Sequence, residues 1–194
     1  IVQAGGSASA VVFDVSDRAA SAQALQALLQ DGPIQILVNN AGIHDDAVFA
    51  GMRAAQWDDV LGVSLNGFFN VTQPLMLPML RTRWGRIVSV SSVAALAGNR
   101  GQVNYAAAKG ALHAASKSLA LEVASRGVTV NVVAPGLIAT AMIEGRFDAD
   151  AIRRIVPMQR AGEAGEVAEL VAFLASEKAA YISGQVISIN GAMI

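Results

Sequence analysis

The sequence contains no cysteine, only two histidines, and few charged or aromatic residues, which make up 15% and 5% of its 194 positions. The lack of cysteine excludes disulfides and thiol chemistry, and two histidines make a structural zinc site improbable. A net charge of −1 without a basic run argues against nucleic-acid binding. No apolar run reaches the ~18 residues of a membrane span, and no signal-peptide pattern opens the chain. We therefore expect a cytoplasmic protein that binds neither nucleic acid nor a membrane.

Apolar residues are abundant instead, at 54% of the chain, which suits one domain over residues 1–194. Strand-like and helix-like runs alternate, and this predicts an α/β fold: a doubly wound, mostly parallel, Rossmann-like sheet with helices on both faces. Pro74 and Pro78 predict a kink or an end in the second helix. The predicted strands are 8–13, 34–38, 86–90, 128–133 and 186–189, and the predicted helices are 17–30, 56–80, 104–125, 148–155 and 166–176.

Tyr105 and Lys109 are the most informative residues, because four positions apart on a helix they share one face. A close ammonium lowers the pKa of a phenol, which is about 10 by itself, by about 1–3, toward the range of proton transfer near neutrality. Ser92 follows the predicted strand 86–90, at the strand end where open α/β sheets place their chemistry. Each feature alone has an ordinary structural explanation. Their order, strand, loop and helix, favours a site that holds a carbonyl and protonates its oxygen while a hydride reaches its carbon.

Other short motifs surround this trio in a fixed order. Together with Ser92, Tyr105 and Lys109 they resemble the short-chain dehydrogenase/reductase family, and within it the bacterial beta-ketoacyl-acyl-carrier-protein reductases. The resemblance extends from Asp14 nearly to the C-terminus. The motifs are Asp14–Val15, Asn39–Gly42, Pro135–Gly136 with Ile138 and Thr140, and Ile189–Gly191.

The resemblance implies a role for each of these residues. Tyr105 would be the catalytic acid/base, Lys109 would lower its pKa and bind the nicotinamide ribose, and Ser92 would orient the substrate carbonyl. Gln102 would line the substrate cleft. The residues implied in cofactor binding are Asp14, Val15, Asn40, Ala41, Gly42, Val63, Tyr105, Lys109, Pro135, Gly136, Ile138 and Thr140.

Some of these assignments have simpler explanations. Asp14 could accept a hydrogen bond from an adenine amino group, or it could complement the dipole of the following helix. The segment Asn40–Gly42 could let a ribose lie against the backbone, or it could be a plain turn. We interpret His44 and His113 as helix or subunit-interface residues rather than catalytic ones.

The sequence departs from the family pattern in three places. Ser64 stands where the family has a catalytic Asn, and Asn66 lies about 200° further round a helix. Ser keeps a donor and an acceptor but has a shorter reach. Ala192 stands where a second Gly is common, and no Gly-x-x-x-Gly-x-Gly loop occurs. Because the first residue is Ile1, we expect that loop and two strands upstream. In a doubly wound sheet with the strand order 3-2-1-4-5-6, the strand 8–13 would be strand 3 and the strand 34–38 would be strand 4. The two upstream strands, 1 and 2, would then lie between them.

The resemblance implies NADPH-dependent reduction of a 3-oxoacyl thioester on acyl carrier protein to the (R)-3-hydroxyacyl thioester, with NADP(H) favoured over NAD(H). It also implies a homotetramer, to which apolar Phe68 and Phe69 would contribute. Arg83 and Arg126 match a basic surface for the acidic carrier, although Arg126 equally complements a helix C-terminus. Two alternatives remain. One is a reductase of a CoA thioester, a sugar or another small carbonyl or alcohol. The other is a catalytically weak, cofactor-binding partner subunit, which Ser64 favours.

Overall fold

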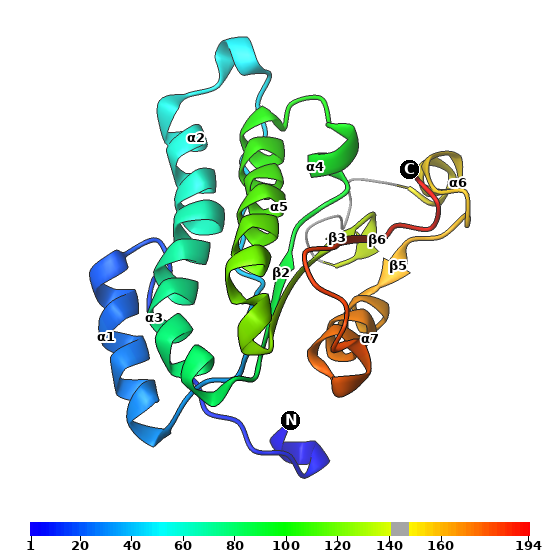
Figure 1. Cartoon of the computed structure of the whole chain (residues 1–194). Helices are drawn as coiled ribbons and strands as arrows, with labels where there is room; N and C mark the ends of the chain where they lie inside the picture. The colour runs from blue at the N-terminus through cyan, green and yellow to red at the C-terminus, as the bar shows by residue number, and fades with distance from the viewer. Residues whose placement is uncertain (141–147) are drawn as a thin grey trace.

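A central parallel sheet organises the molecule (Figure 1). The computed structural model describes residues 1–140 and 148–194. In the main sheet the strand order follows the chain, and all neighbours are parallel, as predicted. Its four strands are β1 (Ile36–Asn39), β2 (Gly85–Val90), β3 (Val128–Pro135) and β6 (Val186–Ile189).

Helices cover both faces of this sheet, as the sequence predicts. Helices α1, α3 and α5 stand on one face and α7 on the other (Figure 1). No helix within the described ranges is long and apolar enough to cross a membrane. The helices are α1 (Arg18–Leu28), α2 (Ala54–Leu61), α3 (Gly67–Thr82), α4 (Ala94–Ala97), α5 (Val103–Val123), α6 (Ala149–Ile155) and α7 (Ala164–Ala175).

Strands β2 and β3 are buried along almost their whole length, because helices cover both of their sides. Ile87 and Val130 pack into the cluster beneath α1, α3 and α5, whereas Val88 and Val133 pack into the cluster beneath α7. Each such buried aliphatic side chain contributes about 1.5–3 kcal/mol. The two central strands therefore form a rigid platform, and the loops at their carboxyl ends start from it.

The predicted helix 56–80 is helical throughout, but it is not one regular α-helix. It divides into α2 and α3, which are joined by a π-helical turn at Gly62–Asn66. Pro74 and Pro78 do not end it, since α3 runs through both to Thr82. The expected end at these prolines is therefore wrong, and the irregular turn of this helix lies earlier, at Gly62–Asn66.

The predicted strand 8–13 is wrong in this structure. The segment forms no strand, and its Val12 side chain is 97% exposed. A strand needs a hydrogen-bonded neighbour, and β1 forms the edge of the sheet on this side. Ile36 and Val38 of β1 are accordingly 47% and 41% exposed. Within the described residues, no strand pairs with this side of β1.

A small second sheet was not predicted. Strand β4 (Ile138–Ala139) pairs with β5 (Gly162–Glu163) in parallel. This sheet pairs the segment that follows β3 with the segment that precedes α7. Two-residue strands carry too little periodicity to be found in a sequence.

Gly127 precedes β3 in the left-handed region, with φ at +70°. A methyl group there would approach the backbone oxygen of Arg83 to within 2.4 Å. We expect Gly127→Ala to lower the free energy of unfolding by about 2 kcal/mol, measured by urea denaturation. Gly165→Ala is the control, because nothing lies within 4 Å of its added methyl and alanine favours α7. Equal stability of the two variants would contradict this account.

Candidate active site

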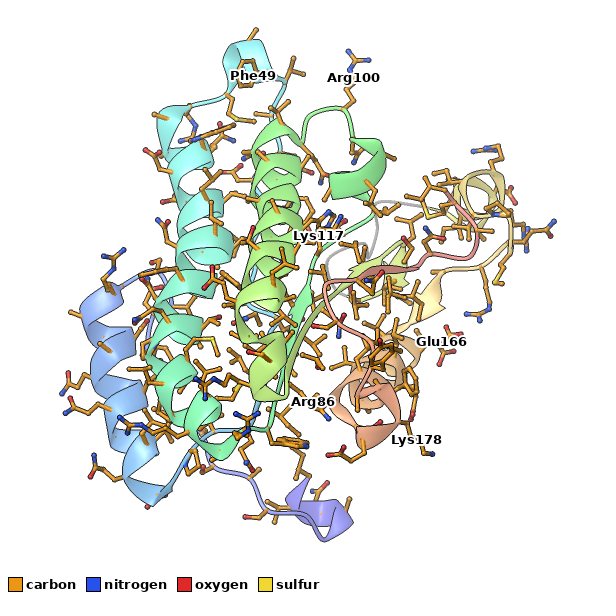
Figure 2. All side chains as sticks on the ribbon, in the orientation of Figure 1. Phe49, Arg86, Arg100, Lys117, Glu166 and Lys178 are labelled. Carbon is orange, nitrogen blue, oxygen red and sulfur yellow. The ribbon has the colours of Figure 1, made fainter. Side chains whose placement is uncertain are left out.

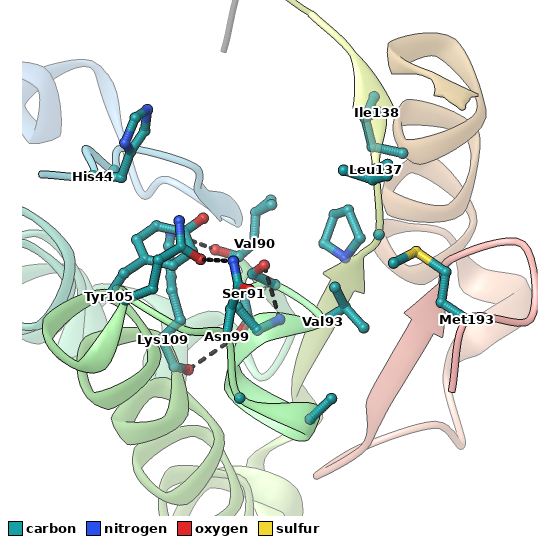
Figure 3. A pocket seen from close by; sticks show the side chains of 18 of the residues that line it. His44, Val90, Ser91, Val93, Asn99, Tyr105, Lys109, Leu137, Ile138 and Met193 are labelled. Atoms are coloured by element: carbon teal, nitrogen blue, oxygen red, sulfur yellow. Dashed lines mark hydrogen bonds between the residues drawn. The ribbon is translucent and has the colours of Figure 1, made fainter. Parts of the chain in front are cut away.

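A cavity of about 590 Å³ opens at the carboxyl ends of β2 and β3. Tyr105 and Lys109 come to it from α5, and Leu137, Ile138 and Met193 lie across from them (Figure 3). Ser92, in the loop after β2, lines the same cavity as Tyr105 and Lys109. The three residues predicted to be catalytic are thus brought together, at the sheet edge where the sequence placed them. Their catalytic role stays a prediction.

Lys109 is buried because it belongs to the inward stripe of α5. Asn104, Ala108, Leu112 and Ser116 share this stripe. The Lys109 Nζ donates to the backbone oxygen of Val90 at 2.8 Å and lies 5.9 Å from the centre of the Tyr105 ring. Burial lowers the pKa of Lys109 from its ordinary 10.5 to about 8. The ammonium is therefore charged at neutrality, but close to losing its proton.

The expected lowering of the Tyr105 pKa is wrong for this structure. Burial raises the pKa of the Tyr105 phenol above its ordinary value of 10. A side-chain hydrogen bond with Ser92 lowers it in part, and the charge of Asp46 raises it further. Desolvation of the phenolate is the largest cause, and the Lys109 ammonium, almost 6 Å from the ring centre, does not reverse it. The phenol stays protonated at neutral pH, the form that can donate a proton.

The residues predicted to bind the cofactor divide between two cavities that share Asn40. Gly42, Pro135, Gly136, Ile138 and Thr140 line the large cavity. Val15, Ala41 and Val63 line a smaller one of about 120 Å³ beside β1. Asp14 lines neither, and its carboxylate accepts from the backbone and the hydroxyl of Ser16, both at 2.8 Å. These bonds lower the pKa of Asp14.

Two other predicted residues lie at the mouth of the large cavity. The side-chain amide of Gln102 donates to both carboxylate oxygens of Asp46 at 3.1 Å. Gln102 thus lines the cavity as expected. His44 lies in a loop and not in a helix, and its Nδ1 is 3.3 Å from Asp46 without hydrogen-bond geometry. Within the described residues, no group of three or more metal-ligating side chains gathers.

Arg83 and Arg126 lie away from the cavity, at the amino ends of β2 and β3. They are neighbours, because the Arg83 guanidinium donates to the backbone oxygen of Ser125 at 3.1 Å. The eight residues of β3 span about 26 Å between this end and the cavity. A surface formed by this pair is therefore separate from the cavity of the same chain.

Ser91 was assigned no role from the sequence, and His113, which was interpreted as a helix or subunit-interface residue, lies in α5 beside it. The Ser91 hydroxyl lies 2.7 Å from His113 Nε2 and 3.0 Å from the Lys109 backbone oxygen. The spacing of His113, four residues after Lys109, was the available signal. Its partner could not be found this way, because Ser91 lies on a different element.

Comparison with known proteins gives a consistent result. Residues 1–193 match the family model described as "Enoyl-(Acyl carrier protein) reductase". The 3-oxoacyl-[acyl-carrier-protein] reductase FabG of Aggregatibacter actinomycetemcomitans is 45% identical over 97% of this chain and 79% of its own length. The FabG of Thermotoga maritima is 42% identical over 97% and 78%. The acetoacetyl-CoA reductase of Rhizobium meliloti is 44% identical over 92% and 76%.

The chain belongs to the short-chain dehydrogenase/reductase family. It is therefore an oxidoreductase that acts on a CH–OH or C=O group, and its family implies a nicotinamide cofactor.

The residues of this short-chain reductase fit the ribose of a nicotinamide cofactor. A side chain on Gly42 would lie 2.8 Å from Lys109 Nζ, so glycine keeps the ammonium open to the cavity. The same point lies 3.7 Å from the hydroxyl of Ser64, which is buried and has no hydrogen-bond partner among the described residues. An ammonium and an unpaired hydroxyl beside an open backbone suit a ribose, which both donates and accepts hydrogen bonds.

The substitution of Ser64 for the Asn of other short-chain reductases takes place inside the π-helical turn. Ser64 is buried, whereas Asn66 is exposed and faces away, as the helical angle predicts. The turn thus directs Ser64, and not Asn66, toward Lys109. Ala192, which replaces a common Gly, adopts φ of +67°, a region that glycine occupies with less strain.

Proposed function

We propose that the protein reduces a 3-oxoacyl thioester carried on acyl carrier protein to the (R)-3-hydroxyacyl thioester, with NADPH as the reductant. The observation that carries the proposal is the convergence of Ser92, Tyr105 and Lys109 on one cavity with a protonated phenol. The names of the two FabG relatives support the carrier-linked substrate.

Three side chains have different roles at the substrate carbonyl. A nicotinamide cofactor, when bound, would supply a hydride for the carbonyl carbon. Ser92 donates a hydrogen bond that orients the carbonyl oxygen, and Tyr105 transfers its proton to that oxygen. The Lys109 ammonium stabilises the negative charge that then develops on the phenol. Asn40, Gly42, Pro135, Gly136 and Lys109 would hold the nicotinamide end of the cofactor.

Reduction of a CoA thioester is the second candidate, because the acetoacetyl-CoA reductase relative is about as similar as the FabG relatives. NADPH oxidation by the purified protein should be followed with acetoacetyl-acyl carrier protein and with acetoacetyl-CoA. A kcat/KM about tenfold higher for the carrier-linked substrate supports the first function. The reverse ratio supports the second. Lack of turnover with either substrate would contradict both functions and favour a weak partner subunit.

Replacing NADPH by NADH in the same assay tests the cofactor preference.

We further propose that the carrier docks on Arg83 and Arg126, which form a basic pair at the amino ends of β2 and β3. Because this pair lies about 26 Å from the cavity of its own chain, the acyl group would enter the cavity of a neighbouring copy. Arg100, by contrast, extends from the loop near the cavity, at the opposite end of the molecule from Arg86 of β2 (Figure 2). The two surfaces can therefore be tested separately.

The double variant Arg83→Glu/Arg126→Glu is expected to lower kcat/KM for the carrier-linked substrate at least about tenfold, with little change for acetoacetyl-CoA. The difference should shrink at high salt, because exposed charges are screened beyond ~10 Å. Arg100→Glu is the matched control and should leave both values unchanged. A loss confined to Arg100→Glu would move the docking surface to the cavity mouth.

The same proposal requires an oligomer, and we propose a homotetramer in the cytoplasm. Phe69 and Leu77 of α3 and Leu121 of α5 are 48%, 66% and 86% exposed, which is the kind of apolar surface that subunits cover. We expect light scattering at micromolar concentration to give four times the mass of one chain. A monomeric mass would exclude both the tetramer and delivery to a neighbouring copy.

A further inference from the structure

Ser91 joins the two elements that carry the catalytic trio. Its side chain is buried, with 4% exposed, and its backbone amide donates to the Val133 oxygen of β3 at 2.8 Å. The residue is therefore fixed to the sheet, immediately before Ser92. Its hydroxyl contacts α5 twice, at the Lys109 backbone oxygen at 3.0 Å and at the His113 imidazole at 2.7 Å.

The direction of these two hydrogen bonds follows from the single proton of the Ser91 hydroxyl. The Ser91 hydroxyl has one proton, which it donates to the Lys109 carbonyl, because a carbonyl can only accept. The hydroxyl oxygen must then accept from His113, so Nε2 carries the proton. Burial and the charge of Lys117 both lower the pKa of His113, and the ring is therefore neutral at pH 7. Neutral His113 with its proton on Nε2 satisfies the Ser91 hydroxyl.

This arrangement ties α5 to the end of β2 through one backbone oxygen and one side chain of the helix. Residues 109 and 113 are separated by one helical turn, and a single hydroxyl contacts both. Rotation of α5 about its axis would break at least one of the two bonds. A rotation of about 10° moves a side-chain tip ~6 Å from the axis by about 1 Å, and an error of that size in a catalytic group can cost ~100-fold in rate. The link thus controls how Tyr105 and Lys109 face Ser92.

We propose that His113 is a positioning residue, which acts through Ser91 to lock the helix that carries Tyr105 and Lys109 to the strand end that carries Ser92. It does not touch the substrate. The proposal rests on the reductase function proposed above, but the cross-link itself can be tested without turnover.

Two substitutions at His113 distinguish the loss of the hydrogen bond to Ser91 from the loss of the imidazole ring itself. Gln can place an amide donor near the position of Nε2, whereas Asn can place one only near that of Nδ1. We expect His113→Asn and Ser91→Ala to lower kcat about 10–100-fold with KM within about twofold, since only the reacting geometry changes. His113→Gln should keep kcat within about threefold. Ser116→Ala should change nothing, because it also removes a buried hydroxyl from α5 but one without a partner among the described residues.

A measurement on the ring proton tests the cross-link independently. In the intact protein, the Nε2 proton of His113 should give a nitrogen-bound resonance that exchanges slowly with water, and Ser91→Ala should remove it. Loss of kcat in His113→Asn with rescue in His113→Gln supports the proposal. Wild-type kcat in His113→Asn, an equal loss in His113→Gln, or rapid exchange in the intact protein would overturn it. If the protein reduces neither thioester, the proposed function fails, and the ring proton still decides whether the link exists.

Discussion

Tyr105→Phe is expected to lower kcat for thioester reduction about 10³-fold while the fold stays intact. The substitution removes one hydroxyl, and a positioned proton donor accounts for about 10²–10⁴-fold in rate. Since burial keeps the pKa of the phenol high, Tyr105 is protonated at neutral pH and lies beside Ser92 in the cavity as a proton donor. Steady-state NADPH oxidation measures the loss, and the melting temperature checks the fold.

The chain offers a matched control for this experiment. Tyr181 is the other of its two tyrosines and is fully exposed, so Tyr181→Phe removes the same hydroxyl away from the cavity. Its turnover should equal that of the unmodified protein. Near-normal turnover in Tyr105→Phe would show that the proton comes from elsewhere, and the assignment of the catalytic acid would be wrong.

Lys109→Met is expected to change activity and stability in opposite directions. Turnover should fall by at least ~10²-fold, because no cation then stabilises the charge on Tyr105. The free energy of unfolding at pH 7 should rise by about 1–3 kcal/mol. A pKa lowered from 10.5 to about 8 means that the folded state disfavours the buried ammonium by about 3 kcal/mol, and the unpaired Val90 oxygen offsets part of the gain.

The stability gain expected from Lys109→Met should depend on pH. Below about pH 8 the folded and the unfolded states both hold the Lys109 proton, and the full penalty is present. Between pH 8 and 10.5 only the unfolded state holds it, so stability rises with pH and the advantage of Lys109→Met shrinks. Urea denaturation at several pH values measures this. Lys117→Met, at an exposed position of the same helix, should stay within about 0.5 kcal/mol at every pH. A stability gain that does not vary with pH would argue against desolvation as its cause.

The sequence predicted best what depends on local periodicity. The continuous apolar runs of β2 and β3 and the long stripe of α5 fix which residues face inward, and with them the meeting of Tyr105, Lys109 and Ser92. The strand 8–13 was predicted wrongly for a related reason, because strand propensity says nothing about whether a neighbour is present.

What the sequence could not predict depends on distances between elements. The pKa of Tyr105 was assigned the wrong direction, because the balance between burial and a nearby charge is decided by the depth of the ring and by the 5.9 Å to Lys109 Nζ. The carrier surface at Arg83 and Arg126 stays a prediction, and the position of these residues far from the cavity follows from the direction of the strands. Contacts such as Ser91 with His113 need the packed structure.

Because of the π-helical turn at Gly62–Asn66, the side chains that face the site depend on how many residues the turn contains as well as on which residues they are. A π-helical turn holds one residue more than an α-helical turn would, so the side chains on its two sides differ in angular phase by about 100°. Deleting one residue within the turn would therefore change the composition of α2 and α3 very little, yet it would rotate one helix relative to the other. Ser64 lies at that junction. Insertions and deletions, and not only substitutions, are thus a route by which the lining beside Lys109 can diverge between related chains.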